Sequence, residues 1–298
     1  MADKKTGPKN VWWALPEEKV KKVIELTERW KEIATNYVIG IKADISASSV
    51  GKILHEYFGP RKEKKERKHG LKTCDWMKMH VCWALDTIKI PSKDGYVYAQ
   101  LLIEEYSRCV LGWILSYSNT GEKAKKLIEE TIEKHKITPL VIKTDRGSEF
   151  VNETVKSYLK EKEINYMPSP GHYPLFNGKL ERENSIFRRF LKKKGGMTFE
   201  EISNRMGKAI YVSNHELPRR MFSGKTSADI FKKGEIYQQD EKEILKQKVE
   251  ERIKEIEKLK TPGLDKLDVL RKAVVNCVVD MGLCTIKSGD KNVNLLAV

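Results

Sequence analysis

The sequence contains few cysteines and no long apolar run. Its 298 residues include five cysteines with no CxxC pair, so we expect reduced, buried thiols rather than a zinc site or a disulfide framework. No apolar run approaches the length of a membrane span, and the lysine-rich N-terminus lacks the apolar core of a signal peptide. These absences favour a cytoplasmic protein with no membrane partner.

Basic residues outnumber acidic residues in this sequence. Lysine and arginine total 57 and aspartate and glutamate total 42, which gives a formal net charge of +15. A positive excess of this size favours a polyanionic partner such as nucleic acid, although a basic protein without such a partner would show the same composition.

Three of the acids lie in separate predicted elements. Asp86 falls inside the apolar run 81–90, which reads as a buried strand. Asp145 ends a second apolar run, at 140–145, and a turn signal follows it at once. Glu181 lies near the start of residues 177–194, which have helical spacing.

A charged side chain inside an apolar strand needs a partner, because an unpaired buried carboxylate costs several kcal/mol. A salt bridge would explain Asp86 taken alone. A pair of Mg²⁺ ions would explain Asp86, Asp145 and Glu181 together, because Mg²⁺ binds carboxylate and phosphate oxygens.

The order of predicted elements indicates an α/β fold. Three strands are expected at 81–90, 96–103 and 109–116, followed by a helix at 122–135, the strand ending at Asp145, a second helix and a short strand at 164–167. This order, with the later strands reached through crossover helices, is that of the ribonuclease H-like fold, a mixed five-stranded sheet with flanking helices.

Four fragments in this region resemble the catalytic core of integrases and transposases. Residues 83–87 are similar to its W-x-x-D-x-T, residues 106–113 to Y-S-R-x-x-x-G-W, residues 145–150 to D-x-G-x-E-F, and residues 168–182 to P-x(n)-N-G-x-x-E-R. The interval of 35 residues between Asp145 and Glu181 is also usual in that family.

The resemblance implies a DNA transposase that cuts transposon ends and joins their 3′-hydroxyls to target DNA. It implies two Mg²⁺ or Mn²⁺ ions on Asp86, Asp145 and Glu181, double-stranded DNA as partner, at least a dimer on DNA, and association with the nucleoid. A ribonuclease H-like DNA nuclease without strand transfer remains open, as does a non-catalytic DNA-binding protein derived from a transposase. The chain departs from the family pattern at Arg146, where Asn is common, and at Glu105, where Asp is common.

Helical spacing separates two candidates for the third acid. Around a helix, Glu181 falls on a polar face and Glu183 at the margin of an apolar stripe, so we predict that Glu181 is the metal ligand and Glu183 a salt-bridge partner at the rim. The predicted DNA contacts in this region are Lys179, Arg182, Ser185, Arg188 and Lys192.

Residues 1–60 are predicted to be helical. One helix is expected from Pro16 to about Tyr37 and a second from Ser46, and the pair could form a helix-turn-helix that presents Ser48, Ser49 and Lys52 to DNA. A helical hairpin that only packs fits the same pattern. Residues 61–75 read as a basic linker.

The predicted core spans residues 76–235. Its last part, 211–231, partly resembles the segment that follows the core in bacterial transposases, and we expect Arg219 and Arg220 to be available to phosphates there. Residues 236–298 are predicted to form a helical C-terminal region with a possible hairpin around 288–290.

Overall fold

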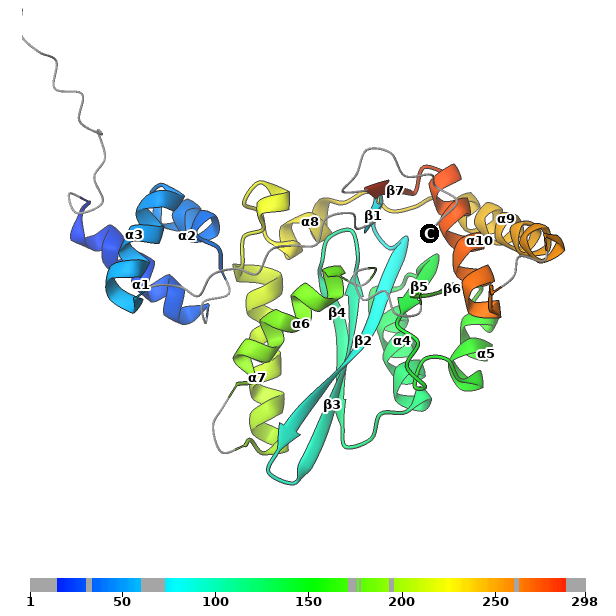
Figure 1. Ribbon diagram of the computed structural model, residues 1–298, viewed down its shortest axis with the longest axis horizontal. Coiled ribbons are helices and arrows are strands. Elements are labelled where there is room, and N and C mark those ends of the chain that lie inside the picture. The colour runs from blue at the N-terminus through cyan, green and yellow to red at the C-terminus, as the bar shows by residue number, and fades with distance from the viewer. Residues whose placement is uncertain are drawn as a thin grey trace, which may run out of the picture.

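The computed structural model describes residues 15–30, 34–59, 73–170, 176, 178–192, 196–259 and 263–287. The predicted hairpin at 288–290 and most of the predicted linker lie outside the described residues. Figure 1 shows three parts along the chain: a group of short helices at the N-terminal end, a sheet with helices on both sides, and a helical C-terminal part.

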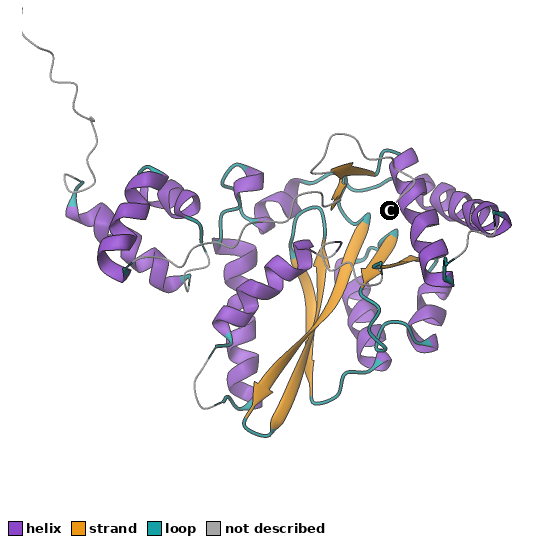
Figure 2. Ribbon diagram, viewed as in Figure 1, coloured by secondary structure: helices purple, strands orange, loops and turns teal. Residues whose placement is uncertain are grey.

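The central sheet has five strands in the order β4-β3-β2-β5-β6. The strands are β2 (Cys82–Ser92), β3 (Gly95–Glu104), β4 (Val110–Ser116), β5 (Val141–Thr144) and β6 (Asn165–Pro168). The pairs β2/β3 and β3/β4 are antiparallel, while β2/β5 and β5/β6 are parallel. This is the mixed sheet of the ribonuclease H-like fold, and it confirms the predicted fold class (Figure 2).

Helices cover both faces of the sheet. They are α4 (Gly121–His135) and α5 (Glu153–Glu161) on one face, and α6 (Gly178–Phe190) and α7 (Phe199–Tyr211) on the other. Along β2, Trp83 and Leu85 pack with α4 and α5, whereas Ala84 and Ile88 pack with α6 and α7. Since successive side chains of a strand point to opposite faces, Asp86 belongs to the face that α6 covers.

The described part of the N-terminal region, 15–30 and 34–59, contains three helices where we predicted two. They are α1 (Glu17–Arg29), α2 (Asn36–Ala43) and α3 (Ala47–Phe58). The expected helix to Tyr37 is wrong because Thr35 starts a new one: its side chain accepts a hydrogen bond from the Val38 amide, which an N-cap does.

A tight turn joins α2 to α3. Asp44 adopts the left-handed conformation with φ 53°, and the Ser46 hydroxyl caps α3 by accepting a hydrogen bond from the Ser49 amide. A Cβ on Gly40 would lie 2.6 Å from the carbonyl oxygen of Ile45, so only glycine allows this close approach.

The N-terminal helices contact the segment that follows α7. Arg29 forms an ion pair with Glu216 in the π-helical segment η3 (Val212–Glu216), with 2.5 Å between Nη2 and Oε1. The Arg220 guanidinium, in the 3-10 segment η4 (Arg220–Phe222), lies over the Tyr37 ring at 5.6 Å.

The C-terminal part consists of α8 (Ser227–Lys233), α9 (Gln239–Lys258), α10 (Lys266–Asp280) and β7 (Cys284–Lys287). β7 pairs antiparallel with β1 (Thr73–Trp76), a strand that falls at the end of the predicted linker. α10 packs on α9 and on β6, so the C-terminal part extends one edge of the core.

All five cysteines are free and buried, as predicted. None of the helices that the structure describes has the length and apolar character needed to cross a membrane.

Candidate active site

Asp86 and Asp145 meet because of strand register. Leu85 of β2 and Thr144 of β5 are the last paired residues of these parallel strands. Asp86 follows Leu85 within β2, and Asp145 follows Thr144 just beyond the end of β5. Two neighbouring strands therefore present carboxylates at the same level of the sheet. Burial, together with the negative charge of Asp145, raises the pKa of Asp86 to about 6.

The pKa of Asp145 is also raised, first by burial and then by the nearby charge of Glu149, although a hydrogen bond from the Gly147 amide at 2.9 Å acts in the opposite direction. Two acids whose ionised forms are both disfavoured by burial and by like charge would be stabilised by a cation.

Helix α6 lies over these acids. Its Asn184 donates a hydrogen bond through Nδ2 to Oδ2 of Asp86, and the positive charge of Arg188 also favours the ionised form of Asp86. Asn184 is one turn beyond Glu181, so the two side chains share a side of the helix. Glu181 itself is exposed.

A divalent cation fits the chemistry of this donor set. The carboxylates are hard oxygen ligands, and the buried Oδ1 of Asn184 accepts no hydrogen bond from any group that the structure describes. Within the same described residues, no three His, Cys, Asp or Glu side chains lie close enough to hold one metal ion. The structure thus brings Asp86 and Asp145 together and leaves Glu181 exposed on the adjacent helix.

Polar side chains hold the loop after Asp145. Asn119 donates to Glu149 at 2.6 Å and accepts from Gln100 at 2.8 Å, which links the loop to β3. A Cβ on Gly147 would lie 2.5 Å from Oε2 of Glu149 and 3.0 Å from Oδ1 of Asp145. Sequence reasoning missed Asn119 and Gln100 as supports, although the D-x-G-x-E-F motif already contained Glu149.

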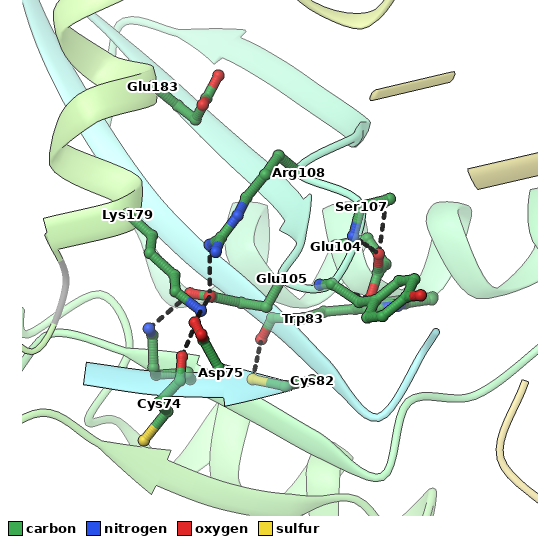
Figure 3. A network of polar contacts seen from close by, with 12 residues as sticks. Cys74, Asp75, Cys82, Trp83, Glu104, Glu105, Ser107, Arg108, Lys179 and Glu183 are labelled. Atoms are coloured by element: carbon green, nitrogen blue, oxygen red, sulfur yellow. Dashed lines mark hydrogen bonds and ion pairs between the residues drawn. The ribbon is translucent and has the colours of Figure 1, made fainter. Parts of the chain in front are cut away.

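A buried cluster of charges fixes α6 to the sheet (Figure 3). Lys143 Nζ lies 2.5 Å from Glu105 Oε1, Arg108 Nη1 lies 3.0 Å from Glu105 Oε2, and Lys179 Nζ lies 3.7 Å from the same Oε2. Burial alone would raise the pKa of Glu105, but Lys143, Lys179 and Arg108 outweigh it and lower the pKa to about 2. Lys143 also donates to the carbonyl of Phe176, just before α6, at 3.4 Å.

Lys179 differs from its predicted role. Its ammonium pairs with Asp75 at 3.1 Å and donates to the carbonyl of Cys74, so it belongs to this partly buried cluster rather than to an open DNA surface. The reason is that β1 and the turn after β3, both distant in sequence, supply carboxylates to the start of α6.

Glu183 is committed to a buried ion pair on the other side of α6. Its carboxylate accepts from the Arg219 guanidinium and from the Ser213 hydroxyl at 3.0 Å. Glu183 is therefore a salt-bridge partner as predicted, but it is buried rather than at the rim. Arg219 is buried with it, so the expectation that Arg219 is available to phosphates is wrong.

The central part of the chain resembles a known protein family. Residues 78–174 match the family model described as the integrase core domain, a stretch that contains Asp86 and Asp145. This part of the chain is similar to an integrase core domain. Glu181 lies beyond the matched residues.

Two known proteins are similar to part of this chain. The putative integrase ORF3 of Spiroplasma virus SpV1-C74 is 29% identical over 146 residues, which are 43% of this chain and 40% of that protein. The transposase for insertion sequence element IS904 of Lactococcus lactis subsp. lactis (strain IL1403) is 25% identical over 144 residues, which are 48% of this chain and 56% of that protein. The chain thus matches about half the length of these relatives.

Two solved structures align with part of this chain. The catalytic core domain of HTLV-2 integrase in complex with magnesium gives a TM-score of 0.43 at 19% identity, covering 52% of this chain and 98% of that one. The simian T-cell lymphotropic virus intasome in complex with PP2A regulatory subunit B56 gamma gives 0.47 at 16% identity, covering 71% of this chain and 73% of that one.

The other predicted DNA contacts divide by exposure. The side chains that are exposed are Ser48, Lys52, Arg182, Ser185, Arg188 and Lys192. Ser49 is buried, because its hydroxyl is hydrogen-bonded to that of Ser46 within the helix cap, at 2.9 Å. We predicted that Ser49 is presented to DNA, and the burial of its side chain contradicts this.

Proposed function

We propose that this chain is a DNA transposase that cuts element ends and joins their 3′-hydroxyls to target DNA. The observation that carries the proposal is the register of β2 and β5, which sets Asp86 beside Asp145 under the helix that bears Glu181. The integrase core match and the relatives described as a putative integrase and a transposase support the same reading.

On this proposal, Asp86, Asp145 and Glu181 would hold two Mg²⁺ or Mn²⁺ ions, and the ions would supply positive charge for activating the attacking oxygen and stabilising the leaving one. The chain's own residues prepare the site. Asn184 orients the Asp86 carboxylate, and the Gly147 amide orients that of Asp145. Glu181 is exposed at the start of α6, where its side chain can turn toward the two aspartates.

The exposed cations of α6 suit the phosphates on either side of the scissile bond. Arg188 acts electrostatically on Asp86, which places its positive charge near that carboxylate. Arg182 is exposed on the same helix, and Lys192 is exposed just beyond its end. Positive side chains here bind backbone phosphates without reading sequence.

The pair α2/α3 would recognise the element ends as a helix-turn-helix. The close approach at Gly40, the left-handed Asp44 and the Ser46 cap give the short turn this motif needs, and α3 exposes Ser48 and Lys52. Joining two ends in concert requires at least two copies of the chain on DNA, so the proposal includes a homo-oligomer working at the nucleoid.

The proposed function is tested by incubating the protein with Mg²⁺, a supercoiled plasmid and a library of DNA fragments with 3′-hydroxyl ends, prepared from the source of the gene. Sequencing of joined products should reveal one enriched donor end. Metal-dependent nicks without joints would instead indicate a ribonuclease H-like nuclease. Binding with neither nicks nor joints would indicate a DNA-binding protein derived from a transposase.

A further inference from the structure

Arg146, the residue after Asp145, extends from the active-site loop to the C-terminal helix α10. Its Nη1 donates to Oδ2 of Asp265 at 2.6 Å, and its Nη2 donates to Oδ1 of Asp268 at 2.5 Å. Its Nε donates to the carbonyl of Ser169, just after β6, at 2.8 Å. All three guanidinium nitrogens thus donate to residues that lie 23 to 122 positions away in sequence.

The two carboxylates are themselves fixed. Asp265 is the N-cap of α10 and accepts a hydrogen bond from the Asp268 amide at 2.7 Å. Asp268 also accepts from the buried guanidinium of Arg271, one turn further along α10. Charges therefore alternate from Asp265 to Arg146, Asp268 and Arg271, and the chain of ion pairs has no net charge.

This arrangement differs from a surface ion pair. The side chains of Arg146, Asp268 and Arg271 are 25%, 20% and 5% exposed, whereas that of Asp265 is 52% exposed. The planar fork of Arg146 meets one oxygen from each of the two acids. Such geometry orders both partners, whereas an isolated surface pair contributes little. Lysine, with one nitrogen, could not hold both acids and the Ser169 carbonyl in the same way.

In this state the Arg146 guanidinium is also unsuited to binding DNA phosphates, because two carboxylates already neutralise its charge. Its backbone is continuous with the loop in which the Gly147 amide binds Asp145 and the Phe150 amide binds the Gly147 carbonyl at 2.9 Å. A contact that immobilises residue 146 therefore limits the movement of the adjacent carboxylate.

We propose that Arg146 is a positioning residue through which α10 sets the conformation of the Asp145 loop, so that the C-terminal region completes the active site of the integrase core. The inference rests on the proposed function for its catalytic consequence. Arg146 departs from the family pattern, and α10 (266–280) lies outside the residues that match the integrase core model. The ion pairs join Arg146 and α10 into one unit.

The first measurement is hydrogen exchange on the metal-free protein, which needs no activity. Arg146→Met and the double variant Asp265→Asn/Asp268→Asn should each speed exchange of the amides at 147, 150 and 151 about tenfold or more. Asp280→Asn is the matched control: it lies at the other end of α10 and removes the carboxylate charge from the Arg252 contact at 3.2 Å, so its loop exchange should equal wild type.

The second measurement is the Mg²⁺ concentration for half-maximal plasmid nicking. Loss of a residue that orients a metal ligand typically costs 10- to 100-fold, so we expect about a tenfold higher requirement in Arg146→Met and in Asp265→Asn/Asp268→Asn, with wild-type behaviour in Asp280→Asn. Combining the Arg146 and aspartate changes should add little, because both act on the same set of ion pairs.

The outcomes separate the two proposals. Wild-type protein that neither nicks nor joins DNA contradicts the proposed function. Active wild type with unchanged exchange and unchanged Mg²⁺ requirement in Arg146→Met contradicts the positioning role. An effect of Arg146→Met that Asp265→Asn/Asp268→Asn does not reproduce also contradicts it, since Arg146 would then act by contacting DNA.

Discussion

Asn184 donates a hydrogen bond to the carboxylate of Asp86 from the same side of α6 that carries Glu181. The bond joins the strand that bears the first acid to the helix that bears the third. It also opposes the burial that raises the pKa of Asp86.

Asn184→Ala should therefore raise the pKa of Asp86 further and weaken divalent-ion binding. We expect about a tenfold higher Mg²⁺ requirement for nicking, in line with other residues that orient metal ligands. Ser157→Ala, which removes an exposed contact with Glu153 on α5, is the control and should behave as wild type. An unchanged requirement in Asn184→Ala would show that the hydrogen bond has no role in the site.

The Glu105 cluster should dominate stability among the ion pairs. Glu105→Gln leaves Lys143 buried without its carboxylate partner, and breaking such a pair costs about 3 to 5 kcal/mol of unfolding free energy. Urea unfolding followed by circular dichroism measures the loss.

The control for this prediction is Glu163→Gln, which breaks the exposed pair with Lys246 and should leave the urea midpoint nearly unchanged. Equal shifts in the two variants would argue that burial of the Glu105 cluster carries no special energetic weight.

His80 gives the protein a predictable sensitivity to acid. Burial, with a smaller effect of His135, lowers its pKa from 6.5 to about 4, and its Nδ1 accepts a hydrogen bond from the Trp83 indole at 3.0 Å. His80 therefore binds a proton near pH 6.5 in the unfolded chain but only near pH 4 in the folded protein. Stability from this group is complete above pH 6.5 and is lost as the pH falls toward 4.

Between pH 7 and 4 the wild type should lose about 3 kcal/mol more unfolding free energy than His80→Gln, in which an amide oxygen can accept from Trp83. Urea titrations at several pH values measure this difference. Parallel stability curves for the two proteins would contradict the buried, neutral state of His80.

Lys52 tests the helix-turn-helix. If α3 lies in a DNA groove, Lys52→Ala should weaken binding of the enriched donor end and reduce the slope of log K against log salt by about one. Lys126→Ala on α4, which also removes an exposed lysine, should leave end selectivity unchanged. Equal effects of the two substitutions would point to α2/α3 as a pair that only packs.

Much of the core followed from local pattern. The runs that contain Asp86 and precede Asp145 are strands because they are apolar and lack glycine and proline, and helical spacing distinguished the exposed Glu181 from the buried Glu183. Period and polarity are local properties, so a single sequence reports them well.

The errors arose where distant segments meet. Lys179 looked like a phosphate contact because its partners Asp75 and Glu105 are 104 and 74 residues away in sequence, and Arg219 was misplaced because Glu183 is 36 residues before it. The break between α1 and α2 was missed because apolar spacing continues across it, although Thr35 was available as a cap signal.

The joining reaction itself should depend on Asp145. Asp145→Asn keeps the size of the side chain and its contact with the Gly147 amide but removes the charge, so we expect loss of Mg²⁺-dependent joining with DNA binding retained. Glu181→Gln should behave in the same way. Joining at the wild-type rate in either variant would remove that residue from the catalytic set.

The most direct measurement is anomalous diffraction from crystals soaked in Mn²⁺. The account predicts manganese between the carboxylates of Asp86 and Asp145, with the Glu181 side chain turned from solvent to become a ligand. Crystals of intact, active protein in which manganese is absent from this position, or in which Glu181 stays away from the bound ion, would contradict the central claim.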